Sequence, residues 1–165
     1  DSVASRGLGD VYKRQVLGSG DWEYEQFFKE MQAKYPGRFV LCQGFVPELA
    51  RKIYGGSDIF LMPSKSEPCG LSQMVALRYG SIPVVRETGG LKDSITDSGD
   101  GKGNGFTFQT YDTQDMLNSV HRAIYAYNES KDGWKVLVER AMACDNSWGR
   151  SANDYIRLYK QLINS

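Results

Sequence analysis

A lone carboxylate lies beside a Pro-Cys-Gly turn in the stretch SKSEPCG, and a helix-like run at 71–80 follows at once. Glu67 is the acid. The first N–H groups of a helix have no partner inside the helix, so those of Gly70, Leu71 and Ser72 could bind an anion such as phosphate. Gly70 lacks a Cβ, which allows close approach to its backbone. The pattern predicts a site for a phosphorylated, hydroxyl-rich ligand, with Glu67 accepting hydrogen bonds from sugar hydroxyls.

Spacing alone also fits a plainer interpretation of Glu67. An acidic residue in a loop before a helix is commonly a solvated side chain that the helix dipole favours. On spacing, this alternative stays open.

The elements around this loop indicate a parallel sheet. Apolar runs without alternation are typical of strands covered on both faces, and ligands of such sheets bind beyond the carboxyl ends of the strands. We expect strands at 16–20, 38–45, 58–63 and 82–85, and helices at 22–35, 46–57, 71–80, 113–128, 131–144 and 149–163. A helical turn within 88–95 and a Gly-rich loop at 96–109, which enters a short extended piece, complete the chain. Asp21 is expected to cap the first helix, and Trp148 to anchor the last.

Composition restricts the class of protein. The 165 residues are 41% hydrophobic, enough for a packed core. Lys+Arg and Asp+Glu both number 20, which argues against a nucleic-acid surface. Three scattered cysteines indicate reduced thiols, and no apolar run reaches the ~18 residues of a membrane span. We expect a cytoplasmic protein with a non-native or disordered leader at 1–15 and a single Rossmann-like domain with a helical tail at 16–165.

A dense, colinear set of motifs carries a family resemblance. The segment SKSEPCGLSQMVALRYGSIPVVRETGGLKDSI resembles the nucleotide-sugar site of bacterial glycogen synthases and plant starch synthases. Further stretches resemble the same family in the same order, namely LGSGDWEYEQFF at 17–28, GGSDIFLMPS at 55–64, GNGFTFQTYD at 103–112 and MACDNSWGRSANDYIRLY at 142–159. The resemblance covers about residues 16–163.

The resemblance implies a fold and an activity. It implies the C-terminal, donor-binding half of a B-type glycosyltransferase, which has two Rossmann-like domains. Such enzymes transfer glucose from ADP-glucose to the non-reducing end of an α-1,4-glucan with retention. The implied partners are ADP-glucose or ADP, the glucan and an N-terminal domain of the same enzyme. The compartment would be the cytoplasm, or the plastid stroma if the source is a plant.

The resemblance also implies roles for individual residues. Glu67 would bind the donor glucose and stabilise the oxocarbenium-like charge. The remaining donor-site residues would line the glucose, the phosphates, the ribose or the adenine, or would shape the crevice, and they are Cys69, Gly70, Leu71, Ser72, Gly44, Phe45, Gly18, Gly20, Thr88 and Gly89. In this set Phe45 would stack on adenine. No metal or other cofactor is expected, because the sequence lacks DxD, HxxH and Cys/His ligand spacing.

Plainer roles remain open for several of these residues. Cys69 could be a small apolar turn residue, and Phe45 could belong to a core. Gly18 and Gly20 could be structural turns. His121 has no Ser or Asp partner pattern and is expected at the surface or in packing.

The sequence departs from the family in three places. The Arg and Lys of the family's G-R-L…Q-K-G segment have no match, and Lys13 and Arg14 do not fit that pattern. Val75 stands where many related transferases carry a second glutamate, and Lys65 replaces a common arginine. The alternatives are therefore a related retaining transferase that uses UDP-glucose, or a non-catalytic nucleotide- or glucan-binding module. A dinucleotide-binding dehydrogenase is disfavoured, because GSGDWEYE lacks the GxGxxG spacing.

Overall fold

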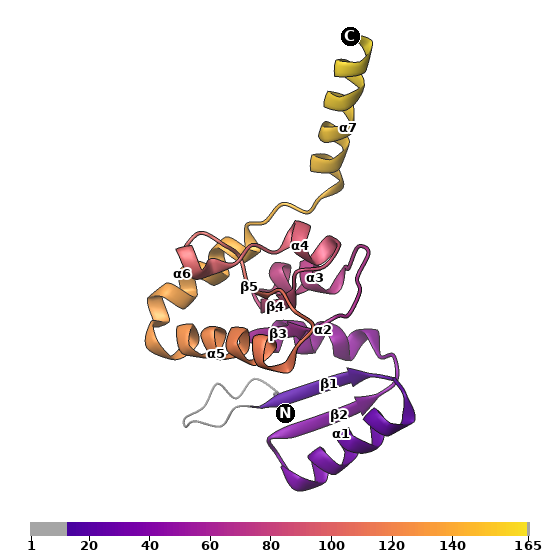
Figure 1. Cartoon of the computed structure of the whole chain (residues 1–165), viewed down its shortest axis with the longest axis vertical. Coiled ribbons are helices and arrows are strands. Elements are labelled where there is room, and N and C mark those ends of the chain that lie inside the picture. Colours follow the sequence, from indigo (N-terminus) through magenta and orange to yellow (C-terminus); the bar gives the residue numbers. More distant parts are fainter. Residues whose placement is uncertain (1–12, 165) are drawn as a thin grey trace. The chain divides into compact units, whose positions relative to one another are not determined.

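The computed structural model describes residues 13–164, and the fold is α/β with parallel strand pairs. The chain forms two compact units that divide between Ser57 and Asp58. Figure 1 labels the elements of both units.

The first unit is built on a two-stranded sheet. Its elements are β1 (Arg14–Gly18), α1 (Trp22–Lys34), β2 (Phe39–Gln43) and α2 (Pro47–Gly56). The strands pair in parallel from Arg14 opposite Phe39 to Gly18 opposite Gln43, and α1 contacts β2. Both strands therefore end at the same edge, and the two loops that follow them meet there.

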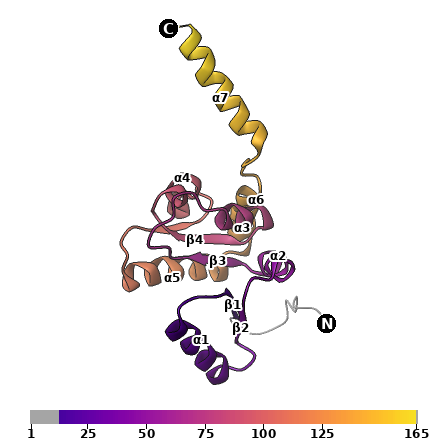
Figure 2. The same cartoon turned by 90° about the vertical axis from the view of Figure 1, so that its right-hand side faces the viewer.

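The second unit holds a three-stranded sheet in the order β3–β4–β5. Its strands are β3 (Ile59–Met62), β4 (Ile82–Arg86) and β5 (Phe106–Phe108). Its helices are α3 (Ser72–Tyr79), α4 (Gly90–Ser94), a 3-10 turn at Ser98–Asp100, α5 (Thr113–Glu129), α6 (Lys131–Met142) and α7 (Trp148–Ile163). Helices α3, α4 and α5 all contact the central strand β4, with α5 on one side of the strands and α3 and α4 on the other (Figure 2).

The core of the second unit surrounds β4. Ile82, Val84 and Val85 of this strand are fully buried. They pack with buried side chains from the flanking helices, namely Leu77, Leu91, Ala123, Trp134, Leu137 and Ala141. Burial on both faces explains why β4 reads as an uninterrupted apolar run.

Glycine ends α3 as its sequence predicts. Gly80 adopts a left-handed conformation at φ 76°, and the N–H of Ser81 donates to the carbonyl of Ala76 at 3.0 Å. This is the Schellman arrangement, which favours glycine because the conformation disfavours a Cβ. It fixes the length of the helix that begins beside Glu67.

The expected strands and helices are present, but the strands pair in two sheets instead of one. An apolar run indicates a strand without specifying its neighbour, and four- or five-residue strands can pair in several ways. The strand β1 also begins earlier than expected, because Arg14 and Gln15 pair with β2. Residues 1–12, most of the expected leader, lie outside the described residues.

Two expected side-chain roles are wrong. Asp21 occupies the position before α1, but its side chain makes no capping hydrogen bond. Trp148 begins α7 but is 89% exposed, so it does not anchor that helix in the described chain. The cap of α7 is Ser147, whose hydroxyl accepts from the N–H of Arg150.

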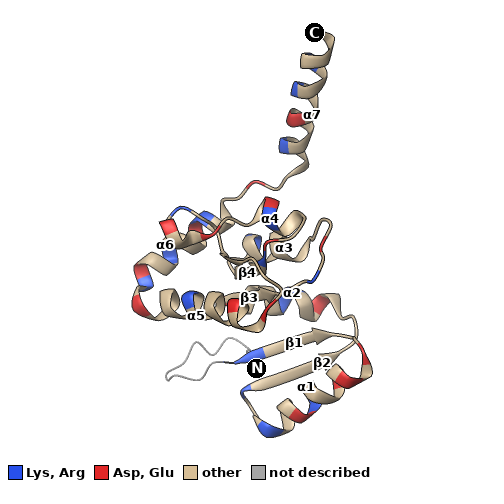
Figure 3. Ribbon diagram, in the orientation of Figure 1, with Lys and Arg blue, Asp and Glu red and all other residues tan. Residues whose placement is uncertain are grey.

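Both α1 and α7 carry positive and negative side chains along their length, as Figure 3 shows. His121 is exposed, as expected. In the stretch that the structure describes, no helix is long and apolar enough to cross a membrane.

Candidate functional site

Glu67 lies in the loop that leads from β3 to α3, at the carboxyl end of the sheet. Its side chain is half-buried. Within residues 13–164, its carboxylate makes no hydrogen bond or ion pair. A partly buried acid without a protein partner leaves its acceptor capacity available to a ligand.

The start of α3 presents N–H groups that lack acceptors. Leu71 occupies the cap position, and no side chain caps the helix. Among the described residues, the backbone N–H groups of Cys69, Gly70, Leu71 and Ser72 have no acceptor. Cys69 and Leu71 are exposed, whereas Gly70 is buried. These donors and the Glu67 carboxylate belong to one short segment, which is a combination suited to phosphate beside sugar hydroxyls.

The turn at Thr88–Gly90 packs directly against this segment. The N–H of Gly90 donates to the carbonyls of Glu67 and Pro68, both at 3.2 Å. A Cβ on Gly89 would lie 2.1 Å from the Glu67 carbonyl oxygen, and one on Gly90 would lie 1.9 Å from that of Cys69. Both positions therefore require glycine, and the structure brings Thr88 and Gly89 next to the Glu67 loop.

Arg86 holds the beginning of the same loop. This residue ends β4, and its guanidinium donates to the carbonyl of Ser64 at 2.9 Å and to that of Lys65. The ring of Tyr111 lies 5.7 Å from the guanidinium carbon. Hydrogen bonds from a charged donor are stronger than neutral ones, so the loop starts from a fixed point.

Four predicted site residues lie in the first unit, at the carboxyl ends of β1 and β2. The N–H of Gly44 donates to the carbonyl of Gly18 at 3.1 Å, and the N–H of Gly20 donates to the Glu25 carboxylate at 3.1 Å. Glu25 also accepts from the side chain of Gln43 at 2.6 Å. The structure thus brings Gly18, Gly20 and Gly44 together as turns at one edge.

Phe45 follows these turns and is 90% exposed. It is therefore not part of a core in the described chain. An exposed aromatic ring at the end of a parallel strand pair is available for stacking.

A separate polar network links β5 to α5. Arg122 forms a two-pronged ion pair with Asp97, at 2.8 and 2.7 Å, and donates to the Thr107 carbonyl at 2.8 Å. Burial raises the pKa of Asp97, but hydrogen bonds from Arg122 and from the N–H groups of Thr107 and Gly99 outweigh it and lower the pKa to about 2.

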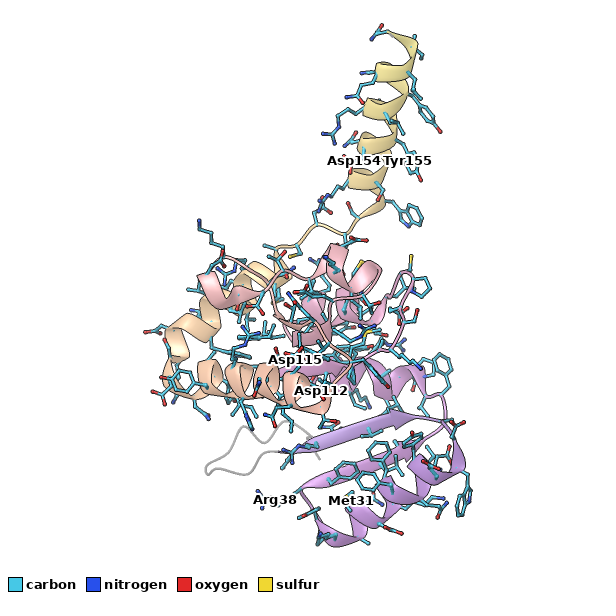
Figure 4. The ribbon with its side chains drawn as sticks, viewed as in Figure 1. Met31, Arg38, Asp112, Asp115, Asp154 and Tyr155 are labelled. Atoms are coloured by element: carbon cyan, nitrogen blue, oxygen red, sulfur yellow. The ribbon has the colours of Figure 1, made fainter. Side chains whose placement is uncertain are left out.

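This network lines a hollow of about 400 Å³, which does not include Glu67. Asp115 lines it too and, with Asp112, lies at the start of α5 (Figure 4). Hydrogen bonds from Thr110 lower the pKa of Asp115. Each charged side chain that lines the hollow has a protein partner, so we assign the network to structure.

The structural roles of Arg86, Gln73 and the Asp97–Arg122 pair are not apparent from the sequence. Arg86, the Asp97–Arg122 pair and the bond from Gln73 to Ser94 link residues 21 to 25 positions apart, which periodicity does not reveal. Only Gln73 offered a local signal that could have revealed its role, because it is a long polar residue among the buried residues of α3. No group of three His, Cys, Asp or Glu side chains in the described part of the chain could hold a metal ion.

Comparison with known proteins places the chain in a family. The model of the glycosyl transferases group 1 matches residues 6–133. The chain is 53% identical to the glycogen synthase of Geobacillus thermodenitrificans over 150 residues, and 49% identical to that of Pseudothermotoga lettingae. Each match covers 90% of this chain but 31% of the relative, so the chain spans about a third of the length of these relatives.

Solved structures support the fold. The catalytic domain of starch synthase IV from Arabidopsis thaliana, bound to ADP and acarbose, matches with a TM-score of 0.79 and 38% identity. That match covers 92% of this chain and 33% of the other. Sucrose-phosphate synthase from Thermosynechococcus elongatus, at 20% identity, a TM-score of 0.61 and coverage of 91% and 38%, shares the fold. The expected likeness to one half of a B-type glycosyltransferase is confirmed, and the chain belongs to the group 1 glycosyltransferases.

Proposed function

We propose that this chain is the donor-binding part of a glycogen or starch synthase. The enzyme transfers glucose from ADP-glucose to the non-reducing 4-hydroxyl of an α-1,4-glucan, with retention. One observation carries the proposal: the Glu67 carboxylate and the N–H groups that open α3 have no protein partner within residues 13–164, yet their loop is held by Arg86 and Gly90. The relatives at 53% identity are named glycogen synthases, which supports the acceptor, and the similar starch synthase IV is bound to ADP, which supports the nucleotide of the donor.

The proposed roles are those that the family resemblance implies, and each fits the donor and acceptor capacity of its group. Glu67 accepts hydrogen bonds from the glucose hydroxyls and stabilises positive charge at the anomeric carbon. The backbone of Cys69, Gly70 and Leu71 lines the glucose and the distal phosphate, and Ser72 lies near the phosphates or ribose. The exposed N–H groups and the helix dipole favour the phosphate's negative charge.

The proposed contact for the nucleoside is an aromatic residue. Phe45 stacks on the adenine beside Gly44, and its 90% exposure supports this role. Gly18 and Gly20 shape the crevice, because their N–H and carbonyl groups hold the turns together.

In the proposed reaction, the bond between the anomeric carbon and the phosphate oxygen breaks. The 4-hydroxyl oxygen of the glucan bonds to that carbon from the same face, and its proton passes to the departing ADP. Donors aimed at the phosphate stabilise the charge that develops there. We propose no metal or other cofactor for this step. The glucan and the remainder of the enzyme supply the other wall of the site.

A chimera tests the proposal. This chain replaces the matching segment of the Geobacillus stearothermophilus glycogen synthase, to which it is 53% identical. We expect the chimera to extend glycogen from radiolabelled ADP-glucose, and an α-1,4-glucosidase to release the label. A folded chimera that uses UDP-glucose in preference, or that binds nucleotide without transfer, contradicts the proposal.

A further inference from the structure

Gln73 is a fully buried amide beside the candidate site. It lies in the first turn of α3 and is 0% exposed. Its Nε2 donates to the carbonyl of Gly70 at 2.9 Å, to that of Cys69 at 3.3 Å and to the Ser94 hydroxyl at 3.1 Å. Its Oε1 is buried and has no hydrogen-bond partner among the described residues. A buried amide with half of its capacity unused is costly, so packing alone does not explain a glutamine here.

The bonds from Gln73 orient two peptide groups. In a trans peptide, the N–H points opposite to the preceding carbonyl. Because the carbonyls of Cys69 and Gly70 turn toward Gln73, the N–H groups of Gly70 and Leu71 turn away from it. These N–H groups are among those that lack an acceptor within the described chain.

Gly70 and Gln73 also fit each other closely. Gly70 has φ 70°, and a Cβ there would lie 2.6 Å from Oε1 of Gln73. The glutamine amide thus fills the space beside the glycine. Any larger residue at position 70 would displace it.

Gln73 further connects the two turns of the site. The Ser94 hydroxyl, which accepts from Gln73, donates to the carbonyl of Gly90 at 2.6 Å. The N–H of Gly90 in turn donates to the carbonyl of Glu67. A continuous set of hydrogen bonds therefore runs from Gln73 through Ser94 and Gly90 to the Glu67 loop.

We propose that Gln73 is a positioning residue, which aims the N–H groups of Gly70 and Leu71 at the distal phosphate of the donor. This inference rests on the proposed function. Gln73 does not touch the substrate. It acts by holding the peptide planes whose donors stabilise the departing phosphate.

The test compares Gln73→Met and Ser94→Ala in the chimera. Methionine keeps the length of the side chain and removes its hydrogen bonds. We expect kcat with ADP-glucose to fall about 100-fold in Gln73→Met, on the scale of losing one preorganised donor, and about 10-fold in Ser94→Ala. The KM for glycogen stays unchanged. Gln161→Met, an exposed glutamine of α7, is the matched control and keeps the parent kcat.

A second measurement uses the 165-residue chain itself. In ¹⁵N–¹H spectra recorded with ADP, the Gly70 and Leu71 resonances shift in the parent and not in Gln73→Met, while the remaining spectrum shows the same fold.

Unchanged kcat in both variants overturns the inference. If Gln73→Met does not fold, unchanged kcat in Ser94→Ala overturns it. A parent chimera that folds but does not transfer glucose contradicts the proposed function instead, so the two failures are distinguishable.

Discussion

Two glycines fix the backbone beneath Glu67. At Gly90 the space for a Cβ is already occupied by the Cys69 carbonyl, and at Gly89 by that of Glu67. At Gly90 the requirement comes from one loop packing against another, whereas Gly89 also has a φ of 45°, which favours glycine by itself. The packing explains why residues 21 and 22 positions apart in the sequence act as one structure.

We predict that Gly90→Ala destabilises the chain by about 1–3 kcal/mol, because the Cβ forces the two loops apart. Urea unfolding followed by circular dichroism measures the change. Gly149→Ala is the matched control, since its Cβ meets only the Ser147 hydroxyl at 3.6 Å. Equal stability of Gly90→Ala and the parent would show that the contact between the loops is not tight.

At Phe45, the prediction concerns the affinity for the nucleotide. Phe45→Ala removes the exposed ring, and we expect the affinity of the chimera for ADP to fall about 10-fold, within the 1–3 kcal/mol of a base–aromatic stack. Isothermal titration calorimetry with ADP and UDP measures this. Tyr125→Ala, an exposed aromatic residue of α5, should leave the affinity unchanged. An unaltered ADP affinity in Phe45→Ala would rule out stacking.

At the scale of the element, the positions of helices and strands could be predicted from the sequence where neighbouring residues decide the structure. Gly80 ends α3, and Pro36-Gly37 follows α1, so these helices have their expected bounds within one or two residues. The apolar strands also occur where predicted. Strand pairing was not predictable, because it depends on which short strands meet.

In the candidate site, too, some residues could be predicted from the sequence and others could not. Glu67, Gly70 and the start of α3 could be identified from their order in the sequence. Arg86 and Gln73 could not, because their bonds reach backbone atoms in a separate loop or on the buried side of a turn.

The ion pair between Asp97 and Arg122 makes stability depend on pH. The pKa of Asp97 is about 2, below its ordinary 3.8, so the carboxylate stabilises the fold above about pH 4. That stabilisation is lost as the pH falls from about 4 toward 2. Since both side chains are partly exposed, we expect it to amount to about 1 kcal/mol.

Asp97→Asn should therefore lower the stability of the chain at pH 7 and flatten its fall between pH 4 and 2. Urea midpoints at each pH measure both effects. Asp154→Asn, in the exposed pair with Arg157, is the control and should behave as the parent. An unchanged pH profile in Asp97→Asn would contradict the role of the pair.

At the scale of the whole molecule, the chain matches about a third of the length of its relatives. The family's G-R-L…Q-K-G segment has no match in this sequence. We predict that the isolated 165-residue chain does not extend glycogen and binds ADP-glucose with a Kd on the order of 1 mM. The reason is that catalysis requires exact placement of the reacting groups, since misplacing them by one ångström costs about 100-fold in rate.

Radiolabel incorporation and calorimetry on the isolated chain check that prediction. The chimera is the positive control. Glycogen extension by the isolated chain at the rate of the chimera would show that the second wall of the site is dispensable.

The most direct test of the central claim is the turnover of Glu67→Gln in the chimera, compared with Glu139→Gln on the exposed face of α6. The amide keeps the size of Glu67 and removes the charge that stabilises the anomeric carbon. We predict that kcat with ADP-glucose falls at least about 100-fold in Glu67→Gln and stays at the parent value in Glu139→Gln. Equal turnover in the two variants would contradict the assignment of Glu67 to the donor site.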